Sequence, residues 1–453
     1  MKLNVKIELK TIGGVYGVRD TFLDNRAMLV VAEDDDFSEV QAQNMGLKTW
    51  WHEEILKLPS VHLVIEHPQY GPIEIDERNV NPVVRFTPLY KKAIVVKKVE
   101  HGIGYKFHGF DDRTLRGEII VLPDKYGTLA VVNIVPEDVL VAGILPAEMF
   151  ATAPVEALKA QAVTARGEVF AKIGKRHVTD PYLLCSEQHC QVYKGLTAEH
   201  SRTNAAAKET RGQFAFHEGK LVDSVYSACC GGHTEANHEV WDQPPSLATQ
   251  GQFDGPVWSQ MKSQKMQDFF PKGLLRKKPE HQNRQLRLQK MNLRHEKEVR
   301  RFLKLPKSDT FCGKSTFNQK GDTYRWERSF TIANLNQLIV DQNIGVFRDL
   351  RVVSRGDGGR ITLLEITGSK GTWLLRRELP IRRFFNNLRS GLFVINRIKD
   401  EAGRIKSVQF QGGGFGHGSG MCQQGAIGMA EAGYNYTEIL WHYYNGATVK
   451  RVF

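Results

Sequence analysis

Glu148 is the carboxylate in this chain whose surroundings best suit acid–base chemistry. It lies on a bend between two segments that read as helices, beside the apolar residues Met149 and Phe150. Apolar neighbours disfavour the charged form of a carboxyl group, so we expect a raised pKa, which a general acid needs. The alternative is an acid near the N-terminus of the second helix that takes no part in chemistry.

A second group of side chains has the chemistry of metal ligands. Cys185, His189 and Cys190 are close together, and His177 lies eight residues before Cys185. Two thiolates and two imidazoles suit tetrahedral zinc, and short spacings lower the chain-entropy cost of closing the site. The Cys-x3-His-Cys spacing is not one of the common finger spacings. Two alternatives therefore stand beside zinc: a disulfide, and a buried thiol with surface histidines.

Two glycine-rich turns carry further polar side chains. The first bends at Gly231-Gly232, after a predicted strand, where the backbone can approach a ligand closely. The side chains around it that could face a cleft are Tyr226, Ser227, His233, Thr234 and Glu235. On its own, this pattern favours a structural turn over a ligand-binding site. The vicinal Cys229 and Cys230 are poor partners for a disulfide with each other, because that bridge strains the peptide.

The second turn, residues 411–420, has glycines on both sides of His417. It runs into a predicted helix that Gly433 ends, so His417, Gln423 and Gln424 lie at a helix entry beside exposed backbone N–H groups. Phosphate loops look similar, but the G-K-[ST] signature is absent. We therefore expect His417 to orient a polar substrate.

A mixed α+β fold must position these residues. Pro136 and Pro154 stand at first-turn positions of two helices, and apolar residues recur at three- and four-residue steps until Gly174. We expect Pro146 to interrupt the first helix. Two predicted strands within residues 116–135 lead into the pair.

Residues 1–115 are strand-like and lack a chemical motif. Short β-branched runs separated by Gly, Pro, Asn and Asp predict a β-rich accessory domain. These runs lie at residues 5–9, 27–31, 61–67, 72–76, 83–86 and 93–99. The acidic run at residues 33–36 has the wrong spacing for a calcium loop and indicates a solvated turn.

The composition is that of an ordinary soluble protein. The 453 residues are 41% hydrophobic and 25% charged, and no apolar run approaches the length needed to span a bilayer. The N-terminal segment lacks the apolar core of a signal peptide. The protein therefore stays inside the cell, has a start that is processed or misassigned, or leaves by an unusual route.

One segment holds most of the positive charge. Residues 272–307 contain 13 lysines and arginines against 3 glutamates, a difference of 10 in a chain of net charge +12. Such a segment could contact an anionic polymer, an acidic membrane surface or nucleic acid, or could be a solvated helix without a partner. No helix-turn-helix, RNA-binding or finger signature accompanies it, so nucleic acid is the weakest of these options.

Taken in order, five segments resemble the stage II sporulation protein D (SpoIID, amidase-enhancer LytB) family. They are ILPAEMFATAPVEALKAQAVTARGEVFA, CSEQHCQVYKG, SVYSACCGGHTE, LRSGLFVI and GFGHGSGMCQQGA. The resemblance covers residues 116–450, interrupted by the basic segment, and five motifs in the family's order make it specific. It implies a SpoIID-like mixed domain with a substrate groove, preceded by the β-rich accessory domain.

The resemblance also implies a lytic transglycosylase of the bacterial cell wall. Glu148 falls in the family's P-x-E-M segment and inherits the catalytic role. It would protonate the oxygen leaving from the β-1,4 bond between N-acetylmuramic acid and N-acetylglucosamine. Once ionised, it would take the proton of the C6 hydroxyl that closes the 1,6-anhydro product. One carboxylate then suffices, whereas an ordinary glycosidase needs two.

Binding roles follow from the same resemblance. Some relatives bind zinc through a His, Cys, His-Cys set, and the matching residues are His177, Cys185, His189 and Cys190. Zinc would be structural there, because four protein ligands leave no open position. Arg166 matches a basic residue that lines the family's groove. The residues expected to contact the substrate are Arg166, Tyr226, Ser227, His233, Thr234, His417, Gly418 and Gln423.

The expected organisation places two parts of one catalytic domain around the basic insertion. The accessory domain covers residues 1–115, the first catalytic part 116–271, the insertion 272–320 and the second catalytic part 321–453. The expected partners are peptidoglycan glycan strands and another cell-wall hydrolase. The resemblance implies the cell envelope as location, although no export signal is visible. The alternative function is a non-catalytic cell-wall binder that stimulates an amidase.

Overall fold

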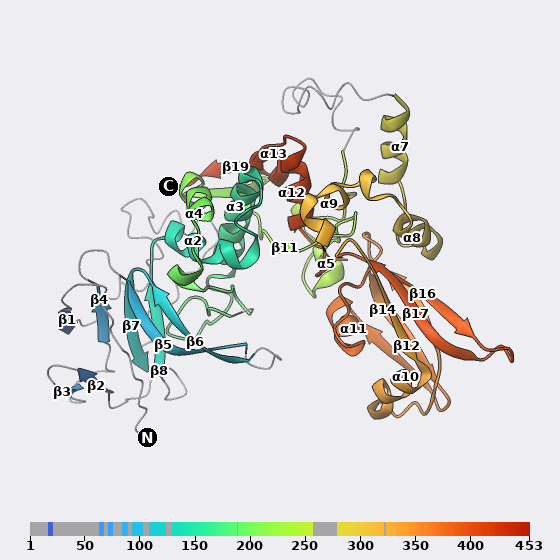
Figure 1. The fold of residues 1–453 in the computed structure, drawn as a ribbon, viewed down its shortest axis with the longest axis horizontal. Coiled ribbons are helices and arrows are strands. Elements are labelled where there is room, and N and C mark those ends of the chain that lie inside the picture. The colour runs from blue at the N-terminus through green and yellow to red at the C-terminus, as the bar shows by residue number, and fades with distance from the viewer. Residues whose placement is uncertain are drawn as a thin grey trace. The chain divides into compact units, whose positions relative to one another are not determined.

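The computed structural model describes ten stretches of the chain, which form two compact units (Figure 1). The described residues are 17–20, 63–67, 71–75, 84–88, 93–102, 108–123, 129–187, 189–256, 279–320 and 323–453. The first unit comprises Met1–Thr152, Gln161–Phe214 and Lys450–Phe453, and the second comprises Ala153–Ala160 and Ala215–Val449. The strands predicted at residues 5–9 and 27–31, the acidic turn at 33–36 and residues 272–278 of the basic segment lie outside the described residues. Helices and strands both contribute, so the fold is α+β, as predicted.

The first unit begins with antiparallel strands, as the β-rich pattern predicts. One four-stranded sheet has the order β1-β4-β7-β8, and the pairs β2–β3 and β5–β6 accompany it. The bounds are β1 Gly17–Asp20, β2 Leu63–His67, β3 Gly71–Ile75, β4 Val84–Thr87, β5 Ile94–His101, β6 Gly109–Leu115, β7 Glu118–Pro123 and β8 Leu129–Ile134. The continuous apolar run of β7, residues 119–122, is buried, as expected of a strand with neighbours on both edges. Because β4 pairs with β7, this sheet crosses the domain boundary predicted at residue 115.

Two helices follow the sheet, and they confirm the predicted helical pair: α2 (Glu137–Glu148) and α3 (Val155–Lys172). The prediction that Pro146 interrupts the first helix is wrong, because α2 continues through Pro146 to its end. The proline lacks the N–H that would bond the carbonyl oxygen four residues earlier, so α2 loses one backbone hydrogen bond. The N–H of Met149 still bonds the carbonyl oxygen of Leu145 (2.9 Å) and closes the last turn.

Small and aliphatic side chains pack α2 against α3 and α4 (Ser201–Glu209). The buried cluster consists of Val141, Ala142, Leu145, Ala162 and Ala207. Gly174, with φ +71°, follows the end of α3 as predicted. At 18 residues α3 is the longest helix in the described part of the chain, where no helix is long and apolar enough to cross a membrane.

The second unit contains two three-stranded antiparallel sheets, with the orders β12-β17-β16 and β13-β14-β15. Their bounds are β12 Arg325–Thr331, β13 Phe347–Arg355, β14 Ile361–Gly368, β15 Thr372–Arg376, β16 Phe393–Lys399 and β17 Ile405–Gly413. Helices α10 (Ile332–Leu338) and α11 (Glu378–Phe384) complete this part. An aromatic cluster forms its core: the Phe385 ring lies 5.4 Å from that of Phe330 and 5.0 Å from that of Phe410.

A second set of elements surrounds the two glycine-rich turns. Strand β11 (Tyr226–Ser227) pairs in parallel with β18 (Met421–Cys422), which runs directly into α12 (Gln423–Glu431). Three short helices belong to the same unit: α5 Asn237–Val240, α9 Phe311–Lys314 and α13 Tyr436–Tyr443. A further three-stranded sheet has the order β10-β9-β19, with β9 Gln213–His217, β10 Lys220–Leu221 and β19 Thr448–Arg451. The predicted strand before Gly231 and the predicted helix before Gly433 are therefore both present.

The described part of the basic segment is packed into the second unit. It forms α7 (Pro279–Gln289) and α8 (Glu296–Leu303), and Val299 and Phe302 of α8 are fully buried. Several of its arginines pair with acids, and Arg294 contacts Asp357 at 2.9 Å. The segment thus has a structural role, and its contact with an anionic surface stays a prediction.

Candidate functional site

Glu148 is the last residue of α2, where the chain leaves the helix in an extended conformation. Its side chain is partly exposed, with buried Met149 and exposed Phe150 (67%) beside it. The side-chain amide of Gln191 donates a hydrogen bond to Glu148 Oε1 (2.8 Å). The carboxyl group is therefore both reachable from solvent and held by a neutral donor from another segment of the first unit.

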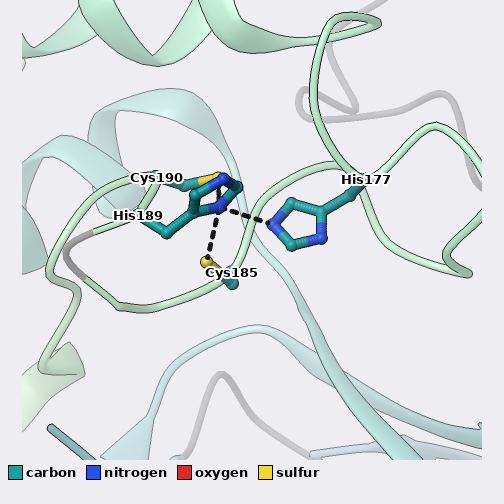
Figure 2. A group of neighbouring side chains, drawn as sticks. All are labelled: His177, Cys185, His189 and Cys190. Atoms are coloured by element: carbon teal, nitrogen blue, oxygen red, sulfur yellow. Dashed lines mark hydrogen bonds between the residues drawn. The ribbon is translucent and has the colours of Figure 1, made fainter. Parts of the chain in front are cut away.

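The four predicted metal ligands converge on one point (Figure 2). Figure 2 shows the His189 ring between the Cys185 and Cys190 sulfurs and the His177 ring. Atom Nδ1 of His189 lies 3.7 Å from Cys185 Sγ, 3.5 Å from Cys190 Sγ and 3.2 Å from His177 Nε2. All four candidate ligand atoms lie within 4.8 Å of one another.

These separations fit the edges of a tetrahedron around zinc. With Zn–S near 2.3 Å and Zn–N near 2.05 Å, ideal edges are about 3.6 Å for N···S and about 3.3 Å for N···N. The other ring nitrogen of His177 contacts Asp180 Oδ2 at 2.7 Å, an arrangement that orients metal-bound imidazoles in many proteins. The residues present therefore fit a four-coordinate zinc ion.

Hydrogen bonding between the two thiols of this group favours the anionic form of one of them. The Cys190 thiol donates toward Cys185 and lowers the pKa of Cys185 to about 4, whereas the same bond raises the pKa of Cys190. A thiolate is the form that binds metal.

The metal group and Glu148 are connected through consecutive residues. Cys190 supplies one sulfur and Gln191, the next residue, holds Glu148. The N–H of Cys190 also bonds the Glu187 carbonyl oxygen (3.0 Å), which tightens this loop. An ion bound by the group would therefore fix the residue that positions the carboxylate.

Arg166 lies in the helical core of the first unit. Its side chain is fully buried and forms an ion pair with buried Glu137 (Nε to Oε2, 2.5 Å). It also donates to the carbonyl oxygens of Ala207 (3.4 Å) and Gln213 (3.2 Å). In this structure Arg166 stabilises the packing of α2 and α3, and its contact with substrate stays a prediction.

In the second unit, the glycine-rich turn lies along residues 226–235. The N–H of Glu235 bonds the Gly418 carbonyl oxygen (2.8 Å), and Cys229 pairs with Phe415. Gly418 has φ +78°, and a Cβ there would lie 1.9 Å from the Arg360 guanidinium. Only glycine fits at this point, so the sequence of the turn is dictated by the close approach of buried Arg360.

The predicted binding residues of this unit divide by exposure. Tyr226, His417 and Gln423 are partly exposed and come from adjoining segments. The His417 ring lies 4.7 Å from that of Trp241, which the sequence did not single out. The buried members are Ser227 (5% exposed), His233 (7%) and Thr234 (1%), and burial lowers the pKa of His233 to about 4.

Residues 125–217 match the model of the stage II sporulation protein family, and residues 239–420 match a domain of unknown function, DUF8618. The chain carries a stage II sporulation protein domain. Glu148, Arg166, Gln191 and the four metal-type ligands all lie within this SpoIID domain. Trp241, Arg360 and His417 lie within the second match.

Three curated relatives extend the comparison beyond the SpoIID domain. An uncharacterized protein of Brachyspira hyodysenteriae is 25% identical over 83% of this chain and 82% of its own length. The amidase enhancer of Bacillus subtilis is 28% identical over 68% of this chain and 40% of its own length. Stage II sporulation protein D of Bacillus amyloliquefaciens is 32% identical over 30% of this chain and 36% of its own length. The chain thus spans less than half the length of the latter two.

The sequence did not point to Gln191, Asp180, Trp241 or Arg360. Asp180 had a local signal, since it follows His177 at a spacing that lets a carboxylate reach the ring. Gln191 and Glu148 are 43 residues apart, so their contact depends on the packing of a whole loop. Arg360 contacts residues 127 and 130 positions away, which no local pattern marks.

Proposed function

We propose that this protein is a peptidoglycan lytic transglycosylase in which Glu148 acts first as acid and then as base. The observation that carries the proposal is the partly exposed Glu148 carboxyl group held by Gln191, inside a SpoIID domain. The substrate is the β-1,4 bond between N-acetylmuramic acid and N-acetylglucosamine in glycan strands. The likeness to Bacillus proteins named amidase enhancer and stage II sporulation protein D supports this substrate class and a site of action outside the cytoplasm.

In the first step, neutral Glu148 gives its proton to the oxygen leaving from the glycosidic bond. The Gln191 amide, donating to Oε1, leaves the proton on Oε2 and fixes the side-chain rotamer. The leaving sugar departs with its electron pair and the transferred proton, and the remaining sugar carries oxocarbenium-like charge.

In the second step, the C6 hydroxyl of the same sugar attacks its own C1. The now ionised Glu148 takes the hydroxyl proton as the C–O bond forms, and the 1,6-anhydro end results. The Gln191 N–H, which donates in both steps, stabilises the carboxylate between them. No second carboxylate is needed, because the nucleophile belongs to the substrate.

The metal group would support this chemistry from a distance. His177, Cys185, His189 and Cys190 would hold zinc with four protein ligands, so the ion would supply rigidity and no open coordination position. Because Gln191 follows Cys190 directly in the chain, that rigidity would hold Gln191 in position beside Glu148.

Contacts with the glycan are also assigned to the second unit. The exposed atoms of Tyr226, His417 and Gln423 are suited to sugar hydroxyl and N-acetyl groups, and Trp241 offers an aromatic face beside His417. Ser227, His233, Thr234 and Gly418, which are buried, would act by holding these residues in place.

The proposal is tested with purified sacculi and mass spectrometry of the released fragments. The intact protein should release 1,6-anhydromuropeptides, and Glu148→Gln should release none above background. The second candidate, a non-catalytic amidase stimulator, is favoured by the printed name of the B. subtilis relative. It predicts no anhydro products from either form, and equal stimulation of a purified amidase by both.

A further inference from the structure

A second group of metal-type side chains lies in the second unit, and none of its four residues has been given a role above. It brings together the side chains of Cys230, Asp254, Cys312 and Cys422, each fully or almost fully buried. One ligand atom from each lies within 4.8 Å of the other three. We call these four residues the buried thiol cluster. None of its cysteines is in a disulfide.

The spacing of the sulfurs suits a bound ion. Cys230 Sγ lies 3.8 Å from Cys312 Sγ. Two thiolates on one tetrahedral zinc, each at about 2.3 Å, are about 3.8 Å apart. A disulfide would instead need the two sulfurs at about 2.05 Å.

The groups around the cluster stabilise anionic ligands. The N–H groups of Cys230 and Gly425 donate to Cys422 Sγ (3.1 and 3.3 Å). Such bonds favour a thiolate over a thiol.

Asp254 is oriented in the same way. The Tyr443 hydroxyl donates to Oδ1 (2.5 Å), and the N–H of Cys312 donates to Oδ2 (2.8 Å). Each carboxylate oxygen has a further lone pair, so both bonds are compatible with coordination of an ion. Metal-bound carboxylates are commonly held by hydrogen bonds of this kind.

We propose that the buried thiol cluster binds one zinc ion through Cys230, Cys312, Cys422 and Asp254. This ion is in addition to the one assigned to the metal group of His177, Cys185, His189 and Cys190, called the His177 group below. The site is closed, with three sulfurs and one oxygen around the ion, and its role is structural. It joins segments that are 82 residues apart (Cys230 and Cys312) and 192 residues apart (Cys230 and Cys422). Fixing such distant segments constrains the chain strongly. The inference does not depend on the proposed enzymatic function.

Cys229 provides a matched control. It is as buried as Cys230 and adjacent to it, but it lies outside the four-residue group, and the Asn318 amide lies 4.0 Å from its sulfur. Replacement of either cysteine by serine changes the same atom, whereas only Cys230 is assigned to the ion. The Cys229 thiol hydrogen-bonds to the Cys312 and Cys422 thiols, so Cys229→Ser also shows what the loss of a neighbouring buried thiol that is not a ligand does to the site.

The test measures zinc in the full-length protein purified with Zn²⁺ and a reductant, by elemental analysis and native mass spectrometry. The intact chain should hold two zinc ions, and the Cys185→Ser/Cys190→Ser variant should hold one. On that background, Cys230→Ser or Cys312→Ser should hold none, and Cys229→Ser should still hold one. X-ray absorption of the Cys185→Ser/Cys190→Ser variant should show three sulfurs at about 2.3 Å and one oxygen at about 2.0–2.2 Å.

The X-ray absorption result does not depend on the cluster variants, because the variant used leaves the second unit unchanged. It therefore decides the matter if Cys230→Ser and Cys312→Ser fail to fold. The proposal is overturned if Cys185→Ser/Cys190→Ser binds no zinc at saturating Zn²⁺, or if its zinc has fewer than three sulfur ligands. Iron in place of zinc, or equal loss of zinc from Cys229→Ser alone, would also overturn the assignment.

Discussion

The side-chain amide of Gln191 lies 2.8 Å from the Glu148 carboxylate and joins the end of α2 to the loop that carries Cys190. This bond gives the carboxyl group a defined orientation at a partly exposed position. It also links the acid to the metal group, because Gln191 and Cys190 are consecutive. Three of the expectations below follow from this arrangement.

Gln191→Met removes the donor and keeps a side chain of similar length. A hydrogen bond to a charged group contributes about 1.5–3 kcal/mol, so we expect kcat for glycan cleavage to fall by about 10- to 150-fold. The KM should change little, because Gln191 holds the acid and does not contact the sugar. Steady-state kinetics on purified glycan strands measures both. A rise in KM at constant kcat would show that Gln191 binds substrate instead.

Loss of the ion from the His177 group should reduce activity through Gln191. We expect Cys190→Ser to lose one zinc ion and to lower kcat/KM at least about tenfold, an effect typical of altered metal-site support. Elemental analysis and anhydro-product release are measured on the same sample. In the control, chelator-treated intact protein should recover activity on addition of Zn²⁺. Full activity in zinc-free protein would separate the metal group from catalysis.

Arg166 should be essential for stability. Removal of one partner from a buried ion pair costs about 3–5 kcal/mol, so Arg166→Met should lower the free energy of unfolding by about that amount. The double variant Glu137→Gln/Arg166→Met should recover part of the loss, because no buried charge is left alone. Urea unfolding measures the stability and kinetics on the folded fraction measures KM. A stable Arg166→Met protein with a raised KM would instead place Arg166 in the substrate groove.

Acid should destabilise the second unit through His442. This side chain is 5% exposed, and among the described residues its Nε2 has no hydrogen-bond partner. Burial lowers the pKa of His442 to about 3, whereas the unfolded chain has the ordinary value of 6.5. The unfolded state therefore binds more protons below pH 6.5, and stability falls as the pH decreases from 6.5 toward 3, by up to about 1.4 kcal/mol per pH unit.

The substitution His442→Phe should remove this contribution, since the ring lies among Phe311 and Tyr443 and phenylalanine does not titrate. Urea unfolding at several pH values between 7 and 4 measures the slope for both proteins. The intact protein should lose stability more steeply than the variant. Parallel slopes would show that His442 is already protonated in the folded state.

Local sequence patterns predicted the helices and strands, whereas the contacts between distant residues depend on long-range packing. The apolar periodicity and Gly174 predicted α3, and Gly433, with φ +90°, follows the end of α12 as predicted, whereas the strand before Gly231 is short and ends at Ser227. The error at Pro146 arose because one missing N–H donor did not end the helix: the last turn of α2 is still closed by the bond from the Met149 N–H to the Leu145 carbonyl oxygen.

In the candidate sites, too, residues close together in the sequence could be predicted and residues far apart could not. The four residues of the His177 group lie within 14 positions of one another, so their spacing was informative. The buried thiol cluster draws on residues as much as 192 positions apart, and only the fold brings them together. The burial of Arg166, His233 and Thr234 was equally invisible, because their burial is set by neighbours that are distant in the sequence.

The central claim is that Glu148 breaks glycan strands by transferring one proton twice. The most direct measurement is mass spectrometry of the products from peptide-free glycan strands, with the intact protein and with Glu148→Gln, which keeps the shape and the Gln191 contact surface. The intact protein should yield fragments with 1,6-anhydro ends, at a rate at least about 100-fold above that of the variant, since general acid–base groups contribute about 10²–10⁴-fold. Equal anhydro-product formation by both proteins, or its absence from both, would contradict the claim.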